Sequence, residues 1–132
     1  MKKITSNDAL YRVEDLLNRS FVQFVLLGNT AKTIIDNFGT DLDDGDITLG
    51  VLRKHYTKSG ASILKALLPR NAEYSKNKIE FKFKDCDSNI VIKIIDRNYA
   101  FFKNPDMVIH KISDFRVPNP FSKYWKTRNL IQ

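Results

Sequence analysis

The chain contains few of the residues from which small proteins build cross-links and metal centres. It has one cysteine, Cys86, and two histidines among its 132 residues. A single cysteine excludes an internal disulfide and is typical of a protein in the reducing cytoplasm. The paired cysteine and histidine spacings of a structural zinc site are absent as well. We therefore predict a cytoplasmic protein whose fold depends on a hydrophobic core.

Long apolar runs are also missing. No stretch approaches the roughly 20 apolar residues that a membrane-spanning helix requires, and the N-terminal residues lack the apolar region of a signal peptide. Hydrophobic residues make up 42% and charged residues 28% of the chain, which is ordinary for a soluble globular protein. The sequence has no repeats and no linker, so we predict one domain over residues 1–132.

The net charge of +7 is unevenly distributed along the chain. Residues 1–50 carry five Lys or Arg against eight Asp or Glu, and residues 51–132 carry seventeen against seven. Carboxylates that bind a metal opposite cations that hold an anionic substrate would produce this asymmetry. A nucleic-acid-binding protein or an ordinary solvated surface would produce it too, so charge alone leaves the three alternatives open.

Hydrophobic periodicity predicts the order helix, strand, helix, strand, helix and hairpin, followed by a tail. The predicted elements are a helix capped by Ser6 or Asn7 with Leu10, Val13, Leu16 and Leu17 on one face, a buried central strand at 21–27, a helix at 31–38 stopped by Gly39, a strand at 47–51, a helix at 59–68 ended by Pro69, and hairpin strands at 78–84 and 90–95. This order predicts an α/β or α+β fold with a small mixed β-sheet flanked by helices.

The most informative stretch joins the first two predicted strands. The first strand leads into Gly28, Asn29 and Thr30, and a short helix follows. Before the second strand the chain places four carboxylates, Asp41, Asp43, Asp44 and Asp46. A small turn beside clustered carboxylates at the start of a strand can position a phosphate and the Mg²⁺ that neutralises it. The pattern thus indicates phosphate-transfer chemistry.

These residues resemble the nucleotidyltransferase fold of the DNA polymerase β-like superfamily, in particular its LicD- and fukutin-related type. That type carries a Gly-Gly-Thr turn, then about a dozen residues, then an acidic run that enters an apolar strand. Laid without a gap on residues 28–51, the pattern places Asp44 and Asp46 on family aspartates. Asp96 resembles the family's third carboxylate, and residues 115–124 resemble its closing segment.

The resemblance implies a metal-dependent nucleotidyl- or phospho-transferase. It uses a nucleotide-linked donor and a hydroxyl acceptor, with Mg²⁺ or Mn²⁺ as cofactor. Asp44, Asp46 and Asp96 would be both the metal ligands and the catalytic carboxylates. The resemblance also implies a group of donor-binding residues, namely Gly28, Asn29 and Thr30 at the phosphates and Arg53, Lys54 and Arg97 for charge stabilisation.

One residue departs from the family pattern. In the ungapped alignment Thr48 occupies the second position of the Asp-x-Asp motif, and a threonine hydroxyl is a poor ligand for a hard cation. Either the metal pair has shifted, to Asp44 and Asp46 or to Asp41 and Asp43, or this chain has lost full metal binding. The second alternative is a catalytically degenerate protein of this fold that binds a nucleotide or a protein partner.

A third alternative is a basic nucleic-acid-binding module. Four lysines accompany the predicted hairpin, namely Lys78, Lys82, Lys84 and Lys93. Lysines interleaved with aromatic residues are typical of single-strand binding surfaces. Phe81 and Phe83, however, lie on the apolar side of the alternation, where we expect core packing to bury them.

Overall fold

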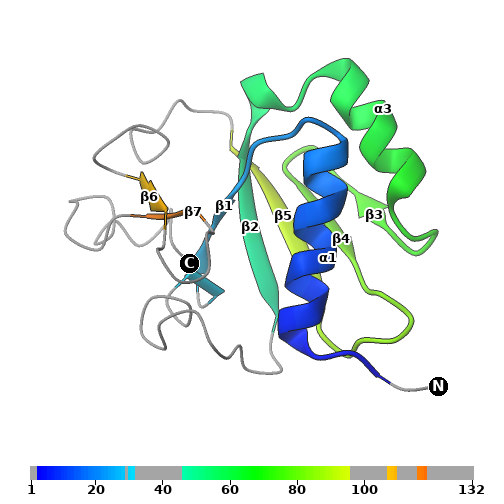
Figure 1. Cartoon of the computed structure of the whole chain (residues 1–132). Helices are drawn as coiled ribbons and strands as arrows, with labels where there is room; N and C mark the ends of the chain where they lie inside the picture. Colours follow the sequence, from blue (N-terminus) through cyan, green and yellow to red (C-terminus); the bar gives the residue numbers. More distant parts are fainter. Residues whose placement is uncertain (1–2, 29, 32–45, 96–106, 110–115, 119–132) are drawn as a thin grey trace.

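The fold of the chain was obtained as a computed structural model, which describes residues 3–28, 30–31, 46–95, 107–109 and 116–118 (Figure 1). Its helices and strands are α1 (Ser6–Arg19), β1 (Val25–Leu26), β2 (Ile47–Leu52), the short 3-10 helix η1 (Arg53–His55), α3 (Lys58–Leu67), β3 (Glu73–Tyr74), β4 (Lys78–Phe81), β5 (Ile90–Ile95), β6 (Met107–Ile109) and β7 (Arg116–Pro118). Residues 28, 30 and 31 are also helical. Among the described residues the predicted order of α1, β1, β2, α3 and the hairpin is confirmed, and β3 is an additional short strand that the sequence did not predict.

Five strands form one mixed sheet in the order β1-β2-β5-β4-β3. β2 and β5 run parallel, with Ile47 opposite Ile90 and Leu52 opposite Ile95, while the other neighbours are antiparallel. A parallel pair needs a long crossover, and here α3 and the β3–β4 segment supply it. β6 and β7 form a separate two-stranded sheet, and β7 lies beside β1. The prediction of a small mixed β-sheet with helices is therefore confirmed.

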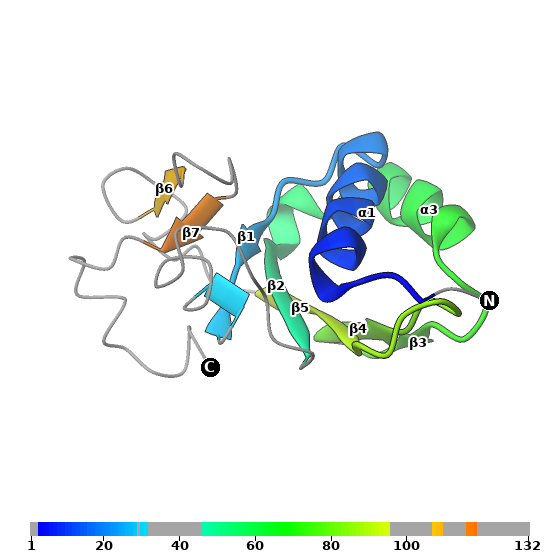
Figure 2. The same ribbon diagram turned by 60° about the horizontal axis from the view of Figure 1, so that its bottom comes forward.

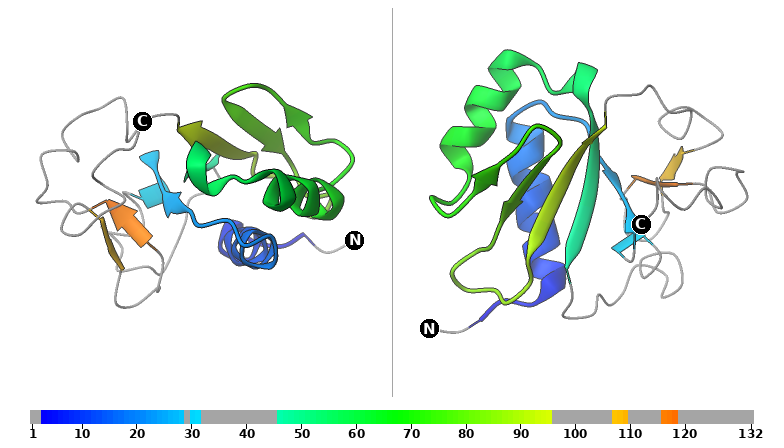
Figure 3. Two further views of the ribbon diagram at one scale, coloured as in Figure 1. Left: turned by 90° about the horizontal axis from the view of Figure 1, so that it is seen from above. Right: turned by 180° about the vertical axis from the view of Figure 1, so that it is seen from behind.

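Helices α1 and α3 cover the same face of the five-stranded sheet, as the turned views show (Figure 2 and Figure 3). The hydrophobic core lies between the two helices and the sheet, because alternate residues of β2 and β5 point toward the helices. Ile47, Leu49 and Val51 of β2 and Ile90 and Ile92 of β5 are buried against the helices. Burial of such branched side chains contributes about 1.5–3 kcal/mol each to the stability of the fold.

The N-cap of helix α1 lies one residue before the first of its two predicted caps. Thr5 is the N-cap, since its hydroxyl accepts a hydrogen bond from the Asp8 N–H at 3.1 Å. Ser6 is instead buried, where its hydroxyl lies 2.6 Å from that of Ser88. Both Ser6 and Asn7 are thus wrong as caps, because the helix start is set by Thr5, which the sequence prediction did not consider.

The predicted central strand at 21–27 is wrong in two respects. Only Val25 and Leu26 pair with β2, and this short strand is at the edge of the five-stranded sheet. The run is still buried from Phe24 to Leu27, but Phe21 is 86% exposed. Phe21 belongs to the turn that ends α1, so apolar composition overestimated the length of the strand.

The hairpin is confirmed, and its packing agrees with the alternation. Ile79, Phe81 and Phe83 are buried, and the two phenylalanine rings meet edge to face with centroids 5.5 Å apart. β4 ends at Phe81 and β5 starts at Ile90, so the connection is longer than the predicted polar turn.

The connection between β4 and β5 is fastened to α1 by charged and polar pairs. Arg12 donates two hydrogen bonds to the carboxylate of Asp85, at 2.9 and 3.1 Å, and its guanidinium lies 4.8 Å from the centre of the Phe83 ring. These hydrogen bonds lower the pKa of Asp85. Lys3 similarly lowers the pKa of Asp87 through an exposed ion pair of 2.8 Å. The helix and the hairpin therefore hold each other at this end of the sheet.

The two remaining helix predictions have different outcomes. The helix predicted at 31–38 begins earlier, at Gly28, and its remainder lies outside the described residues, as does most of the predicted tail. The helix predicted at 59–68 is confirmed as α3 with bounds one residue earlier. Within the described part of the chain, no helix has the length and apolar content needed to cross a membrane.

Candidate functional site

The structure brings together two parts of the predicted site through one buried side chain. Thr30 is 3% exposed, and its Oγ1 accepts a hydrogen bond from the backbone N–H of Thr48 at 2.8 Å. The same hydroxyl lies 3.4 Å from the carbonyl oxygen of Asp46, to which it donates. Leu27 adds a backbone bond to the carbonyl of Thr48 at 3.0 Å. The Gly28 turn is therefore held against the first residues of β2.

Gly28 occupies a conformation that suits its type. Its φ is 55°, in the left-handed region that glycine adopts without strain. Residues 30 and 31 are helical, and the Ala31 N–H donates to the carbonyl of Leu27 at 3.1 Å. Backbone N–H groups at the start of a helix are suitable donors to a phosphate. The prediction that Gly28 and Thr30 bind donor phosphates stays a prediction.

Asp46 and Thr48 lie at the N-terminal end of β2. Asp46 is exposed and directly precedes the strand, and Thr48 is half-buried. Residues two apart in an extended strand point to the same face, and here it is the face opposite α1 and α3, because Ile47 and Leu49 point into the core. A carboxylate and a hydroxyl can therefore act on one ligand at this place.

Gly50 continues the same face, and its lack of a side chain has a packing reason. A Cβ added there would lie 2.6 Å from Cδ1 of Leu27 and 3.1 Å from Cδ1 of Ile95. The space above Gly50 is thus already filled by the leucine that precedes the Gly28 turn. This contact and the Thr30 hydrogen bonds fix the turn against β2 on both sides.

The sheet register separates Ile95, the residue before Asp96, from this end. Ile95 lies opposite Leu52, the last residue of β2, whereas Asp46 precedes the first. A six-residue strand spans about 20 Å at roughly 3.3 Å per residue, and Mg²⁺ ligands lie at about 2.0–2.1 Å from the ion. Asp96 itself lies outside the described residues, so its predicted share in a metal site with Asp46 stays a prediction.

Arg53 and Lys54 are likewise at the wrong end of β2 for the predicted role. They form η1, directly after the strand. Arg53 also has a structural task, since its guanidinium donates to the carbonyl of Lys76 at 2.6 Å and to the side-chain oxygen of Asn77 at 3.3 Å. These bonds tie η1 to the turn before β4. The structure thus does not bring Arg53 and Lys54 to the end of β2 where Asp46 lies, and their predicted role in charge stabilisation stays a prediction.

Several predicted site residues lie outside the described residues. They are Asn29, Asp41, Asp43, Asp44 and Arg97. Within the described residues no group of three His, Cys, Asp or Glu side chains is placed to hold a metal ion. Asp46 is thus the one predicted metal ligand that the structure describes.

The lysines of the hairpin are arranged as a mixed-charge surface. Lys78 lies directly opposite Lys93 in the register, and its ammonium forms an ion pair of 2.7 Å with Glu80. Lys82 and Lys84 are exposed. Because Phe81 and Phe83 are buried on the other face, they are unavailable for stacking on bases.

Comparison of the chain with protein-family models, with curated proteins and with solved structures gave no match. The candidate site therefore stands on its own geometry. The sequence did not predict that Thr30 links the Gly28 turn to β2, since it indicated Thr30 only as a hydrogen-bond donor to a phosphate. A hydroxyl residue two positions after a glycine that ends a strand can cap the neighbouring strand, but nothing in the local pattern names that partner.

Proposed function

We propose that the chain is a nucleotidyltransferase-like protein that transfers a nucleotidyl or phosphoryl group from a nucleotide-linked donor to a hydroxyl acceptor. The observation that supports this most is the hydrogen bond from the Thr48 N–H to Thr30, which holds the glycine turn beside Asp46. A phosphate donor in the turn would then lie next to a carboxylate that can hold its counter-ion. The family resemblance assigns the same two motifs to one site.

The carboxylates of the chain are sufficient to hold Mg²⁺ if Asp44 contributes a ligand beside Asp46. Mg²⁺ in such sites usually keeps several waters and takes one or two carboxylates together with substrate phosphates. Asp46 is exposed, and Asp44 is two residues earlier in the chain. When bound, the ion supplies charge neutralisation of the donor phosphates. The chain's own part is to orient the donor through the backbone at Gly28 and to accept the proton of the acceptor hydroxyl at a carboxylate.

A degenerate protein that binds a nucleotide without turnover is the second candidate. Two observations favour it over the enzyme, namely Thr48 in the motif and the register that places Ile95, the neighbour of Asp96, at the far end of β2. Such a protein would keep the glycine turn and its phosphate contacts while its metal site is incomplete.

A thermal-shift panel tests both candidates. ATP, CTP, GTP, UTP and CDP-choline are each added with Mg²⁺, with Mn²⁺ and with EDTA. A ligand at 100-fold excess over its Kd stabilises by about 2.7 kcal/mol, which is a shift of several degrees. For the enzyme we expect a metal-dependent shift that Asp46→Asn abolishes. Asp15→Asn is the matched control, because it removes an exposed carboxylate that is paired with Arg19 on α1, and α1 covers the other face of the sheet (Figure 2).

The outcomes separate the candidates. A shift that persists in EDTA and in Asp46→Asn supports the degenerate protein, and Thr48→Asp should then create metal dependence by restoring the second carboxylate. No shift with any nucleotide, in either wild type or Thr48→Asp, overturns both candidates.

A further inference from the structure

The turn after α1 carries a side chain that costs stability. The N–H of Val22 donates to the carbonyl of Leu17 at 3.0 Å, and that of Phe21 to the carbonyl of Asn18 at 3.1 Å. These two bonds define a Schellman motif, whose left-handed residue is usually glycine. Here that residue is Phe21, with φ 58° and a side chain that is 86% exposed. A bulky residue in this conformation is strained, and its exposure returns no packing energy.

The turn is pressed against the start of α3, which fixes where Phe21 points. A Cβ added at Gly60 would lie 3.0 Å from the carbonyl oxygen of Ser20 and 3.3 Å from Cγ2 of Val22. Both neighbours of Phe21 therefore pack on the first turn of α3, where they are buried. Phe21, between them, projects outward at this place.

The segment that contains η1 and α3 is cationic. The segment from residue 47 to residue 72 contains no Asp or Glu, and its basic residues are Arg53, Lys54, Lys58, Lys65 and Arg70. Lys54 and Lys58 are exposed, and the first turns of η1 and α3 hold no acidic residue. Lys58 is the first residue of α3, where the helix dipole disfavours a cation.

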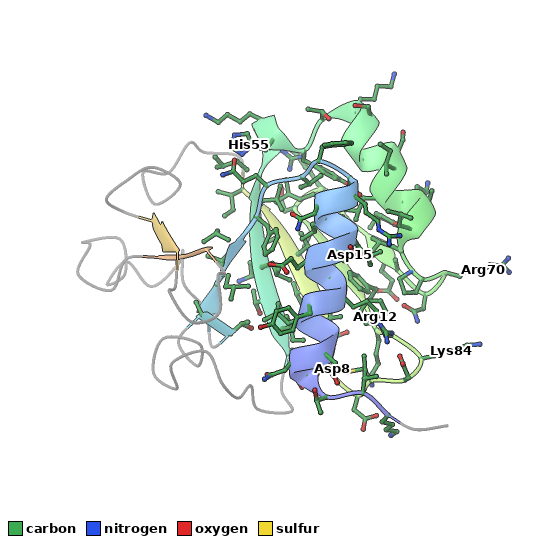
Figure 4. The ribbon with its side chains drawn as sticks, in the orientation of Figure 1. Asp8, Arg12, Asp15, His55, Arg70 and Lys84 are labelled. Carbon is green, nitrogen blue, oxygen red and sulfur yellow. The ribbon has the colours of Figure 1, made fainter. Side chains whose placement is uncertain are left out.

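These features meet at one end of the molecule. The C-terminal end of α1, η1 and the start of α3 lie together at the top of Figure 1. Figure 4 marks this end with His55 and the opposite end of α1 with Asp8. We use the name basic tip for Phe21, Lys54 and Lys58. The basic tip is at the C-terminal end of β2 and thus away from Asp46, so it is independent of the proposed function.

We propose that the basic tip docks on an anionic membrane surface. Phe21 would enter the boundary between headgroups and acyl chains, and Lys54 and Lys58 would lie among anionic headgroups. Peripheral membrane binding requires an apolar anchor together with basic residues. The tip supplies both on an outward-facing turn, and it explains why a strained phenylalanine replaces the glycine that stability alone would select.

A nucleic acid fits the basic tip less well. Single-strand binding sites stack successive bases on several aromatic residues along a groove. The other exposed aromatic residues of the described chain are Tyr11 in α1 and Tyr74 in β3. The Tyr74 ring faces the Lys65 ammonium, 5.7 Å from its centre. These residues lie on separate elements, so the tip offers one aromatic side chain and no stacking platform.

Vesicle sedimentation of the full chain tests the proposal. The probes are phosphatidylcholine vesicles with and without about one-third phosphatidylserine, at low and high salt. We expect salt-sensitive binding to the anionic vesicles only. Phe21→Gly should lower the partition coefficient about tenfold and at the same time raise Tm by about 3 °C, because it removes the left-handed strain. A variant that is more stable yet binds less cannot be explained by misfolding.

Matched variants test the charge. Lys54→Gln with Lys58→Gln should weaken binding by about fivefold per lysine, whereas Lys82→Gln with Lys84→Gln removes the same charge from the hairpin and should change it little. Unchanged vesicle binding by Phe21→Gly overturns the proposal, and so does an absence of binding by wild type. Binding of single-stranded RNA that depends on Phe21, without vesicle binding, overturns it too and assigns the tip to nucleic acid.

Discussion

The two ends of the parallel pair β2–β5 differ in how well their residues suit the local backbone. At the N-terminal end the polar groups are paired: Thr48 N–H with Thr30, Ile47 N–H with the Asn89 carbonyl at 2.8 Å, and Ser6 with Ser88. At the C-terminal end, the turn after α1 holds a phenylalanine at positive φ, and α3 begins with a lysine. The hydrogen bonds at the N-terminal end can hold a site in fixed geometry. The backbone strain at Phe21 is not offset by packing within the chain, and this indicates a contact with another molecule.

The largest effect on stability should come from removing a hydrogen bond at the N-terminal end of the β2–β5 pair. Thr30→Val keeps the volume of the side chain but removes the acceptor of the Thr48 N–H. Leaving that donor unpaired should lower the free energy of unfolding by about 1–3 kcal/mol. Urea unfolding measures it, and an unchanged m-value would show that compactness is kept.

Thr30→Ser is the control for this prediction. Serine retains the hydroxyl and loses one methyl group, so it should keep most of the stability. If Thr30→Val is as stable as wild type, the hydrogen bond does not hold the turn against β2, and the candidate site loses the observation that supports it.

The mixed sheet with helices could be predicted because the signals for its main helices and strands are local. The alternation of the hairpin placed Ile79, Phe81 and Phe83 in the core, and the structure buries all three. The strand at 21–27 could not be delimited in the same way, because Val22 and Phe24 are buried without strand pairing. Its edge position also depends on sheet order, which periodicity does not contain.

The candidate site was predictable only in part, for a related reason. Motif spacing brought Gly28, Thr30 and Asp46 into one site, and the structure places them together. Proximity in sequence did not indicate that Arg53 and Lys54 lie at the other end of β2 from Asp46. They follow the same strand as Thr48, but a strand carries its C-terminal neighbours away from its N-terminal end. Register decides which residues meet, and it emerges from long-range pairing.

A smaller effect is expected at the C-terminal end from Gly60→Ala. Gly60 is in the first turn of α3, where alanine gains at most the roughly 1 kcal/mol by which it is favoured over glycine in a helix interior. At this position, however, its Cβ would lie 3.0 Å from the backbone oxygen of Ser20. Because that oxygen belongs to the turn that caps α1, we expect the displacement to outweigh the helical gain and to destabilise by about 1 kcal/mol net.

Thermal unfolding of Gly60→Ala beside Ser62→Ala measures this difference. Ser62 is exposed on the same helix, so its replacement should be neutral or slightly stabilising. If Gly60→Ala is stabilising like Ser62→Ala, the turn does not pack closely on α3. The outward position of Phe21, and with it the basic tip, would then lose its structural basis.

The smallest effect concerns the ion pairs that fasten α1 near the N-terminal end. Hydrogen bonds from Arg12 lower the pKa of Asp85, so the folded state favours the charged carboxylate. This contribution to stability is complete above the ordinary aspartate pKa of about 3.9 and is lost as the pH falls through the lower folded pKa. Asp85→Asn should thus lower Tm at pH 7, and its difference from wild type should shrink below about pH 4. Asp87→Asn, which breaks the more exposed pair with Lys3, should change Tm less. A difference between Asp85→Asn and wild type that stays constant into strong acid would show that the charge of Asp85 does not fasten the helix.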